Sequence, residues 1–178
     1  MIRPYWKPFL PLLLAAALLG FVASVTVHVL SLTGVLPPTG EYTWGLHIGI
    51  FVVWIPAVML MQQLLPDKKN FNQKDVWKVA LRGCPPWVEK AILGLFYYAF
   101  VNFVIFFFFA AKSPPAGRET PDLFRGFSGH WMIFYGVAAA VFYSAMNAKD
   151  EERRCPNGHA VSLTARFCED CGLPVSDR

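Results

Sequence analysis

Residues 9–32 read FLPLLLAAALLGFVASVTVHVLSL, and this stretch decides how the rest of the chain is interpreted. It contains no acidic or basic side chain except the imidazole of His28. A helix that crosses a hydrocarbon core needs about 20 consecutive apolar residues. A signal peptide cleaved after Ser24 is the competing interpretation, but the apolar region of a signal peptide is only about 7–15 residues long. We therefore expect an uncleaved membrane-spanning helix.

Three later segments repeat this composition, at residues 44–65, 87–111 and 128–147. Hydrophobic residues make up 55% of the 178-residue chain and charged residues only 16%, whereas a soluble domain has about 25% charged residues. The core helices of a soluble protein would keep a polar face for water, and these segments have none. The sequence therefore predicts an all-α membrane protein in which residues 1–147 form a four-transmembrane-helix bundle.

Small residues recur at every fourth position in two of the predicted spans. Residues four apart share one face of a helix, and small side chains on that face let a neighbouring helix approach closely. We expect both faces to point into the bundle. They are formed by Ala16, Gly20, Ser24 and His28 in the first span and by Gly136, Ala140 and Ser144 in the fourth.

The segment between the second and third spans, residues 66–86, is polar and basic. Within it, residues 73–82 have the pattern of a short amphipathic helix whose basic stripe is Lys74, Lys78 and Arg82. Such a helix fits the membrane interface, beside anionic lipids. An ordinary solvated connector is the alternative.

The distribution of Lys and Arg predicts the orientation, because these residues are enriched in cytoplasmic loops. The N-terminal segment has two, the second loop five and the C-terminal tail five, whereas the first loop has none. The third loop has three, which is the main disagreement with this pattern. An even number of spans places both termini on one side, and the count predicts that this side is the cytoplasm.

The tail, residues 148–178, is predicted to be a separate unit with a charged linker and a cysteine-rich module. Cys155 and His159 lie in one short segment, and Cys168 and Cys171 lie in another. Two pairs of ligands from two turns can surround a metal ion, and thiolate and imidazole are ligands that Zn²⁺ prefers. The module has few apolar residues, so we expect a structural Zn²⁺ to provide most of its folding free energy.

The same stretch resembles the small zinc-ribbon tails of bacterial proteins, in which a Cys/His knuckle precedes a Phe-Cys-x-x-Cys-Gly knuckle. The resemblance covers residues 155–174 and none of the membrane part, which resembles no family that we recognise. It departs from the four-cysteine form at His159, which is a change of ligand and leaves the site complete. Together with the spans, the resemblance implies the plasma (inner) membrane of a bacterium.

Other uses of these cysteines are less consistent with the sequence. A redox Cys-x-x-Cys at Cys168 and Cys171 lacks a thioredoxin-like βαβ context, and three cysteines would leave one outside any disulfide. Four protein ligands leave no open position for catalysis. The tail carries five basic and six acidic residues, and a phosphate-binding surface would be basic. We therefore expect no nucleic-acid partner and predict a protein contact.

Three of the four histidines, His28, His47 and His130, are predicted to lie in the outer leaflet on three different helices. Ionisable residues inside a membrane are candidates for functional sites, and two facing histidines could bind haem or a second metal ion. Alternatively, each histidine forms an ordinary interfacial hydrogen bond. Cys84, beside the third span, is a further candidate for acylation or for simple packing.

No nucleotide-binding glycine loop, HExxH helix or nucleophile elbow occurs in the sequence. We therefore expect a non-enzymatic membrane protein that anchors or scaffolds a membrane complex and binds a cytoplasmic protein partner through the zinc ribbon. The first alternative is a haem- or metal-binding subunit in electron transfer. The second is a small transporter, for which acidic relay residues are expected deep within the spans; the one acidic residue of the predicted spans, Glu89, lies at the start of the third.

Overall fold

The computed structural model describes residues 4–64, 76–110, 120–148, 153–161 and 165–175, which are mostly helical. Four long helices dominate: α1 (Leu10–Leu32), α2 (Gly45–Leu64), α4 (Pro86–Ile105) and α5 (Pro121–Asn147). The shorter elements are the 3-10 helices η1 (Pro4–Phe9) and η2 (Gly40–Trp44), helix α3 (Val76–Ala80), the π-helical turn η4 (Phe106–Ala110), and strands β1 (Arg153–Arg154) and β2 (Ala160–Val161).

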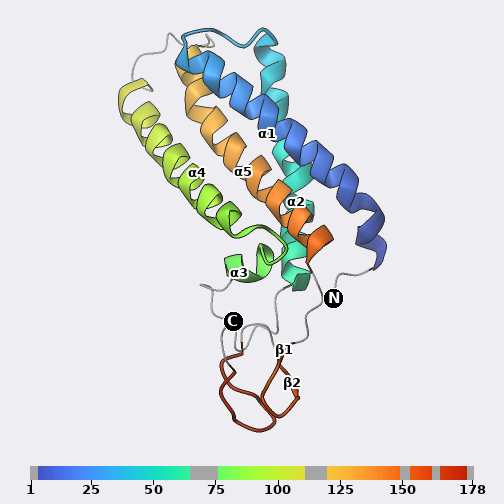
Figure 1. The fold of residues 1–178 in the computed structure, drawn as a ribbon. Helices are drawn as coiled ribbons and strands as arrows, with labels where there is room; N and C mark the ends of the chain where they lie inside the picture. Colours follow the sequence, from blue (N-terminus) through green and yellow to red (C-terminus); the bar gives the residue numbers. More distant parts are fainter. Residues whose placement is uncertain (1–3, 65–75, 111–119, 149–152, 162–164, 176–178) are drawn as a thin grey trace.

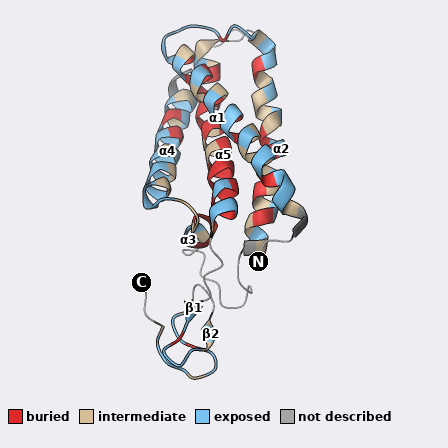
Figure 2. Cartoon of the chain, turned by 45° about the vertical axis from the view of Figure 1, so that its right-hand side comes forward, coloured by how far each residue is buried: buried red, intermediate tan, exposed pale blue. Residues whose placement is uncertain are grey.

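Helix α5 lies at the centre of the bundle. Helices α1 and α4 run in one direction, α2 and α5 run in the other, and α5 packs against each of its three neighbours (Figure 1). Fifteen of the 27 residues of α5 are buried, whereas most residues of α1, α2 and α4 are exposed or only partly buried (Figure 2). The core of the bundle is therefore built around its last helix.

The exposed surfaces of α1, α2 and α4 are strongly apolar. Leu19, Ile48 and Phe100 are examples of large hydrophobic side chains that are exposed on these three helices. All three helices are long and apolar enough to cross a membrane. In water, exposing so much apolar surface would be unfavourable, whereas lipid tails are as apolar as these side chains. The arrangement identifies a membrane protein with at least three candidate spanning helices.

Helix α5 is not among the three helices with the composition of a membrane span. Its buried faces carry small and polar residues, including Ser128, Gly129 and Ser144, where its neighbours approach. A helix surrounded by protein needs less apolar surface than a helix that faces lipid, because its polar groups can bond within the bundle. The central position of α5 accounts for its lower hydropathy.

The small-residue faces predicted from the sequence point into the bundle. Gly20, Ser24 and His28 are buried along α1, and Ala140 and Ser144 are buried along α5. A Cβ atom on Gly20 would lie only 2.2 Å from the ring of Tyr135. This part of the prediction is confirmed, since the absence of a side chain allows α1 and α5 to approach.

The helix boundaries agree with three predicted spans to within a residue or two at most ends, and the fourth helix begins earlier than its predicted span. The segment Pro121–Phe127 was expected to be a loop, but α5 starts at Pro121. The Thr120 side chain accepts a hydrogen bond from the backbone N–H of Leu123 at 3.2 Å, and Asp122 lies in the first turn. A threonine N-cap followed by proline and an acidic residue favours helix initiation.

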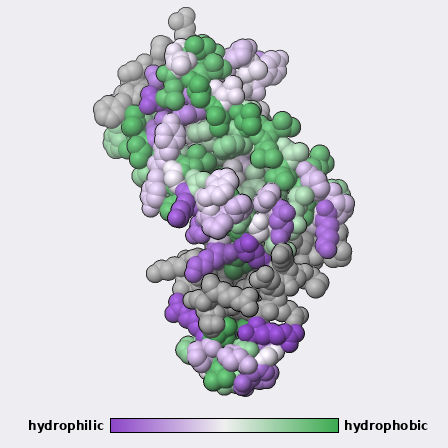
Figure 3. Space-filling model, in the orientation of Figure 1, coloured by the Kyte–Doolittle hydropathy of each residue, from purple (hydrophilic) through white to green (hydrophobic). Residues whose placement is uncertain are grey.

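Helix α3 forms part of the amphipathic helix that was predicted for residues 73–82. Val79, Ala80 and Leu81 are buried against the bundle, while Lys78 is exposed and Arg82 is half-buried. Lys74 lies outside the described residues, so the complete basic stripe stays a prediction. Hydrophobic side chains cover much of the helical part, and hydrophilic ones gather towards the end that carries α3 (Figure 3).

Candidate metal centre

The cysteine module consists of the described residues between 153 and 175, in two turns. Strands β1 and β2 pair antiparallel and bring Cys155 close to His159. The Cys155 N–H donates to the His159 carbonyl at 3.0 Å, and the Gly158 N–H donates to the Cys155 carbonyl at 2.8 Å. Gly158 has φ +84°, a conformation that glycine adopts without steric cost. The first turn therefore holds a thiol and an imidazole together.

The second turn has the same design around Cys168 and Cys171. The Cys168 N–H donates to the Leu173 carbonyl at 2.9 Å, and the Gly172 N–H donates to the Cys168 carbonyl at 2.9 Å. Gly172 has φ +69°, and an antiparallel bridge between Phe167 and Pro174 closes the turn. Each turn thus contributes two side chains of the same candidate site.

The four side chains converge, with ligand atoms that all lie within 4.8 Å of one another. The Sγ atoms of Cys155 and Cys171 are 3.6 Å apart, and Sγ of Cys168 is 3.6 Å from Nδ1 of His159. Ligand bonds of about 2.0–2.3 Å in a tetrahedron give edges of about 3.5–3.8 Å. The residues present therefore fit a tetrahedral metal ion, in agreement with the predicted ligand set.

A disulfide does not explain this proximity, because a sulfur–sulfur bond is about 2.05 Å long and these cysteines are free. Cys155 and Cys168 are buried and Cys171 is half-buried. Burial alone would raise the pKa of Cys155, but hydrogen bonds from the backbone of His159 and Asn157 lower that pKa below its ordinary value. The pKa of Cys171 shifts the other way: a hydrogen bond from the Leu173 backbone lowers it, but burial and the adjacent Cys168 and Cys155 thiols raise it above its ordinary value. Cys155 is therefore the thiol of this pair that ionises first, and the thiolate is the form that binds a metal ion.

His28 is part of a buried hydrogen-bonded group between α1, α4 and α5. Its Nδ1 lies 2.7 Å from Oγ of Ser128, and its Nε2 lies 2.5 Å from the hydroxyl of Tyr98. The Ser128 hydroxyl is also 3.3 Å from the Arg125 carbonyl, to which it donates. An imidazole that donates from Nδ1 to Ser128 and accepts at Nε2 from Tyr98 satisfies every group. Both ring nitrogens of His28 are therefore engaged within the protein.

His47 and His130 form a separate pair between α2 and α5. Their ring centroids are 5.5 Å apart with an interplanar angle of 89°, and Phe127 and Trp131 pack around them. The indole N–H of Trp131 donates to Nδ1 of His47 at 3.0 Å. An imidazole that ligates a metal ion usually donates its other N–H, whereas here Nδ1 of His47 is an acceptor, so Nε2 carries the proton of the neutral ring.

The structure thus brings together His47 and His130, two of the three histidines that were predicted to lie at one depth, and places His28 elsewhere. Ser128, which contacts His28, and His130 are two residues apart on α5 and so point about 200° apart around the helix axis. His28 and His130 therefore face opposite sides of α5. The hydrogen bonds of His28 and His47 are those of ordinary interfacial residues, and the haem or second-metal hypothesis stays a prediction.

Several partners in these groups could not be assigned from the sequence. Tyr98, Ser128 and Trp131 lie in apolar stretches, and nothing in their spacing indicates which histidine each would contact. Asn102 bonds across the interface between α4 and α5: its Nδ2 donates to the Arg125 carbonyl at 2.7 Å, and Arg125 Nε donates to its Oδ1 at 3.2 Å.

Cys84 lies in the turn between α3 and α4. Its thiol donates to the Ala140 carbonyl at 3.3 Å, and burial raises its pKa. A raised pKa leaves little thiolate at neutral pH, and the thiolate is the reactive form. This environment favours packing over acylation.

No protein-family model, curated protein or solved structure matches this chain.

Proposed function

We propose that the protein is a non-enzymatic, multi-pass membrane protein that holds a cytoplasmic partner protein through a C-terminal zinc ribbon. The observation that carries this proposal is the contrast within the cysteine module. Its thiols and imidazole converge inward on one point, while Phe167 is 62% exposed and Leu173 is 38% exposed. A closed metal site supplies rigidity, and exposed apolar side chains on a rigid unit supply a contact surface.

Zinc is the metal that best suits this donor set. Three thiols and one imidazole in a tetrahedral arrangement are typical of structural zinc sites, whereas Mg²⁺ and Ca²⁺ prefer oxygen ligands. Cys155, His159, Cys168 and Cys171 would fill all four positions. When bound, the zinc ion would cross-link the two turns and fix the position of Phe167, which directly precedes one ligand.

The proposal includes a fourth span and a cytoplasmic location for both termini. A helix of 27 residues is about 40 Å long, which exceeds the hydrocarbon thickness, and α5 lies antiparallel to α1 and α4 among the apolar helices (Figure 1). Within the described bundle, Lys7, Lys78, Arg82 and Lys90 lie towards the end that carries α3, where Glu89 is the acidic residue. An excess of Lys and Arg favours the cytoplasmic side, here that of a bacterial inner membrane.

The contact surface can be tested with the full chain in solubilised membranes. We expect affinity purification to recover a partner with the wild-type chain, and at least about fivefold less with Phe167→Ala, as for an aromatic residue central to an interface. Cys168→Ser, which removes one ligand, has the same expected result. The matched control is Tyr42→Ala, because Tyr42 is also an exposed aromatic residue (83%) but lies far along the chain in η2. Undiminished recovery with both module variants would contradict the proposal.

A further inference from the structure

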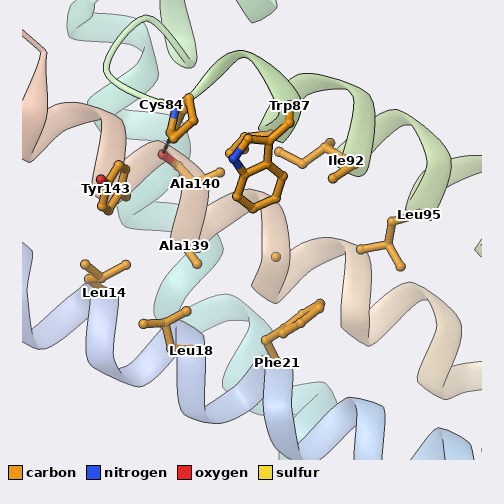
Figure 4. A pocket seen from close by; sticks show the side chains of 14 residues that line it. Leu14, Leu18, Phe21, Cys84, Trp87, Ile92, Leu95, Ala139, Ala140 and Tyr143 are labelled. Carbon is orange, nitrogen blue, oxygen red and sulfur yellow. Dashed lines mark hydrogen bonds between the residues drawn. The ribbon is translucent and has the colours of Figure 1, made fainter.

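A lateral groove of about 600 Å³ runs between α1, α4 and α5. Leu18 and Phe21 form one wall, Trp87 and Leu95 form the other, and Ala139 and Ala140 form the floor (Figure 4). The side chains that line the groove are almost entirely apolar. Its size lies within the range of pockets that bind small ligands, about 300–1,000 Å³.

The floor of the groove lies close to the α5 backbone because the residues of α5 that form it are small. A Cβ atom on Gly136 would lie 3.3 Å from the Phe21 ring and 3.5 Å from the Leu95 side chain, so the two walls meet the floor closely at this inner end. At the other end, the Gly83 N–H donates to Oγ of Ser144 at 3.0 Å and holds the α3–α4 turn on α5. The groove is therefore narrow at the end lined by Gly136 and Leu95, and its other end lies beside Cys84.

Both walls of the groove belong to α1 and α4, which are two of the three helices with the composition of a membrane span. An apolar opening on the lipid-facing side of such a bundle is filled by hydrocarbon in preference to water, which would find no hydrogen-bonding partners there. The indole of Trp87, at the start of α4, suits the level of the lipid headgroups.

Basic side chains occur in α3 and in the turn that leads to the Cys84 end of the groove. Arg82 directly precedes the Gly83–Cys84 turn, and Lys78 is exposed on α3. Glu89 is the acidic residue among the described residues of this region. Basic side chains at the membrane surface attract anionic headgroups by about 1 kcal/mol each.

The shape and lining of the groove suit a single acyl chain. From Pro85 to Leu95 the groove follows α4 for about 15 Å, since a helix rises 1.5 Å per residue. An acyl chain is flexible and has no polar group to leave unsatisfied along this apolar lining. We propose that one acyl chain of an anionic phospholipid occupies the groove, with its headgroup beside Arg82.

Native mass spectrometry of the full chain in detergent tests this site. The probe is an equimolar mixture of phosphatidylglycerol and phosphatidylcholine with identical acyl chains. We expect one phosphatidylglycerol to be retained preferentially per chain, and Arg82→Gln to reduce that preference about fivefold, the factor for one surface charge. Ala91→Trp fills the groove from α4 and reduces retention of either lipid at least fivefold. The matched control is Leu93→Trp, because Leu93 is exposed on the same helix but does not line the groove.

A second measurement uses the wild-type chain and so does not depend on a variant that folds. Phosphatidylglycerol with a photoactivatable group near the end of its acyl chain should label peptides containing residues 14–21, 88–95 and 136–140. Uniform labelling of the outer faces of α2 and α4 would overturn the proposal. So would equal lipid retention by Ala91→Trp and Leu93→Trp, a dimer that Ala91→Trp dissociates without any loss of lipid, or an intact mass that shows an acyl group bonded to Cys84.

Discussion

The ring of Tyr135 on α5 occupies the space that a side chain on Gly20 of α1 would need. A Cβ atom on Gly20 would lie 2.2 Å from Cε1 of Tyr135. The same tyrosine donates from its hydroxyl to the Leu46 carbonyl of α2 at 2.8 Å. Tyr135 thus connects the central helix to two of its neighbours, and Gly20 makes that connection sterically feasible.

Gly20→Ala is therefore expected to destabilise the bundle by about 1–3 kcal/mol, the usual cost of adding volume to a packed core. Its matched control is Gly94→Ala, because a Cβ atom on Gly94 of α4 would meet nothing within 4 Å. Thermal or detergent unfolding of the two purified variants gives the comparison. Equal stability of both variants would show that α1 and α5 do not approach as described.

The hydrogen bond between Tyr98 and His28 predicts a smaller effect. Tyr98→Phe removes the hydroxyl that lies 2.5 Å from Nε2 of His28, and interhelical bonds in membrane proteins contribute about 0.6–1.7 kcal/mol. We expect a loss of stability in this range. Tyr97→Phe, at a neighbouring exposed position, should leave the unfolding transition unchanged, and a loss at Tyr97 as large as that at Tyr98 would contradict this assignment.

The sequence contained most of the information about the helices and the candidate metal site. Uninterrupted apolar runs predicted three helices to within a residue or two at most ends, and the spacing of Cys155, His159, Cys168 and Cys171 predicted a cluster that the structure forms. Both are local signals, because an apolar run predicts one helix and each short turn contains one pair of metal ligands.

The remaining features depend on contacts between distant segments. The sequence did not indicate that α5 would be central. The moderate hydropathy of α5 is a consequence of its burial among the other helices, and the periodicity of a helix does not identify its packing partners. The same holds for the separation of His28 from the His47–His130 pair, which follows from the sides of α5 that Ser128 and His130 occupy. The predicted depth in the membrane was the same for all three histidines, but their directions around the helix axes determine which of them meet.

Orientation can be tested with a membrane-impermeant thiol reagent on intact cells. Tyr42→Cys lies in η2 between the first two spans, and Lys78→Cys lies in α3. Since both termini are proposed to be cytoplasmic, the reagent should label the peptide containing residue 42 and not the peptide containing residue 78. The opposite pattern would invert the topology, and it would place the cysteine module outside the cytoplasm.

Absorption spectroscopy distinguishes the proposed function from the electron-transfer alternative. Both nitrogens of His28 and Nδ1 of His47 are engaged in hydrogen bonds, so we expect the detergent-purified protein to show no haem absorbance. A Soret band in the wild-type protein that disappears in His47→Ala or His130→Ala would instead support a haem-binding subunit. His159→Ala serves as the control, because it alters a histidine of the cysteine module.

The metal content of the full chain, purified in detergent without chelators, tests the zinc ribbon most directly. We expect one zinc ion per chain, and loss of most of that zinc in Cys168→Ser, whose ligand atom lies 3.6 Å from Nδ1 of His159. Cys84→Ser, which alters the cysteine outside the cluster, should retain the full amount. A wild-type chain without zinc, or a Cys168→Ser variant with undiminished zinc, would contradict a zinc ribbon formed by these four residues.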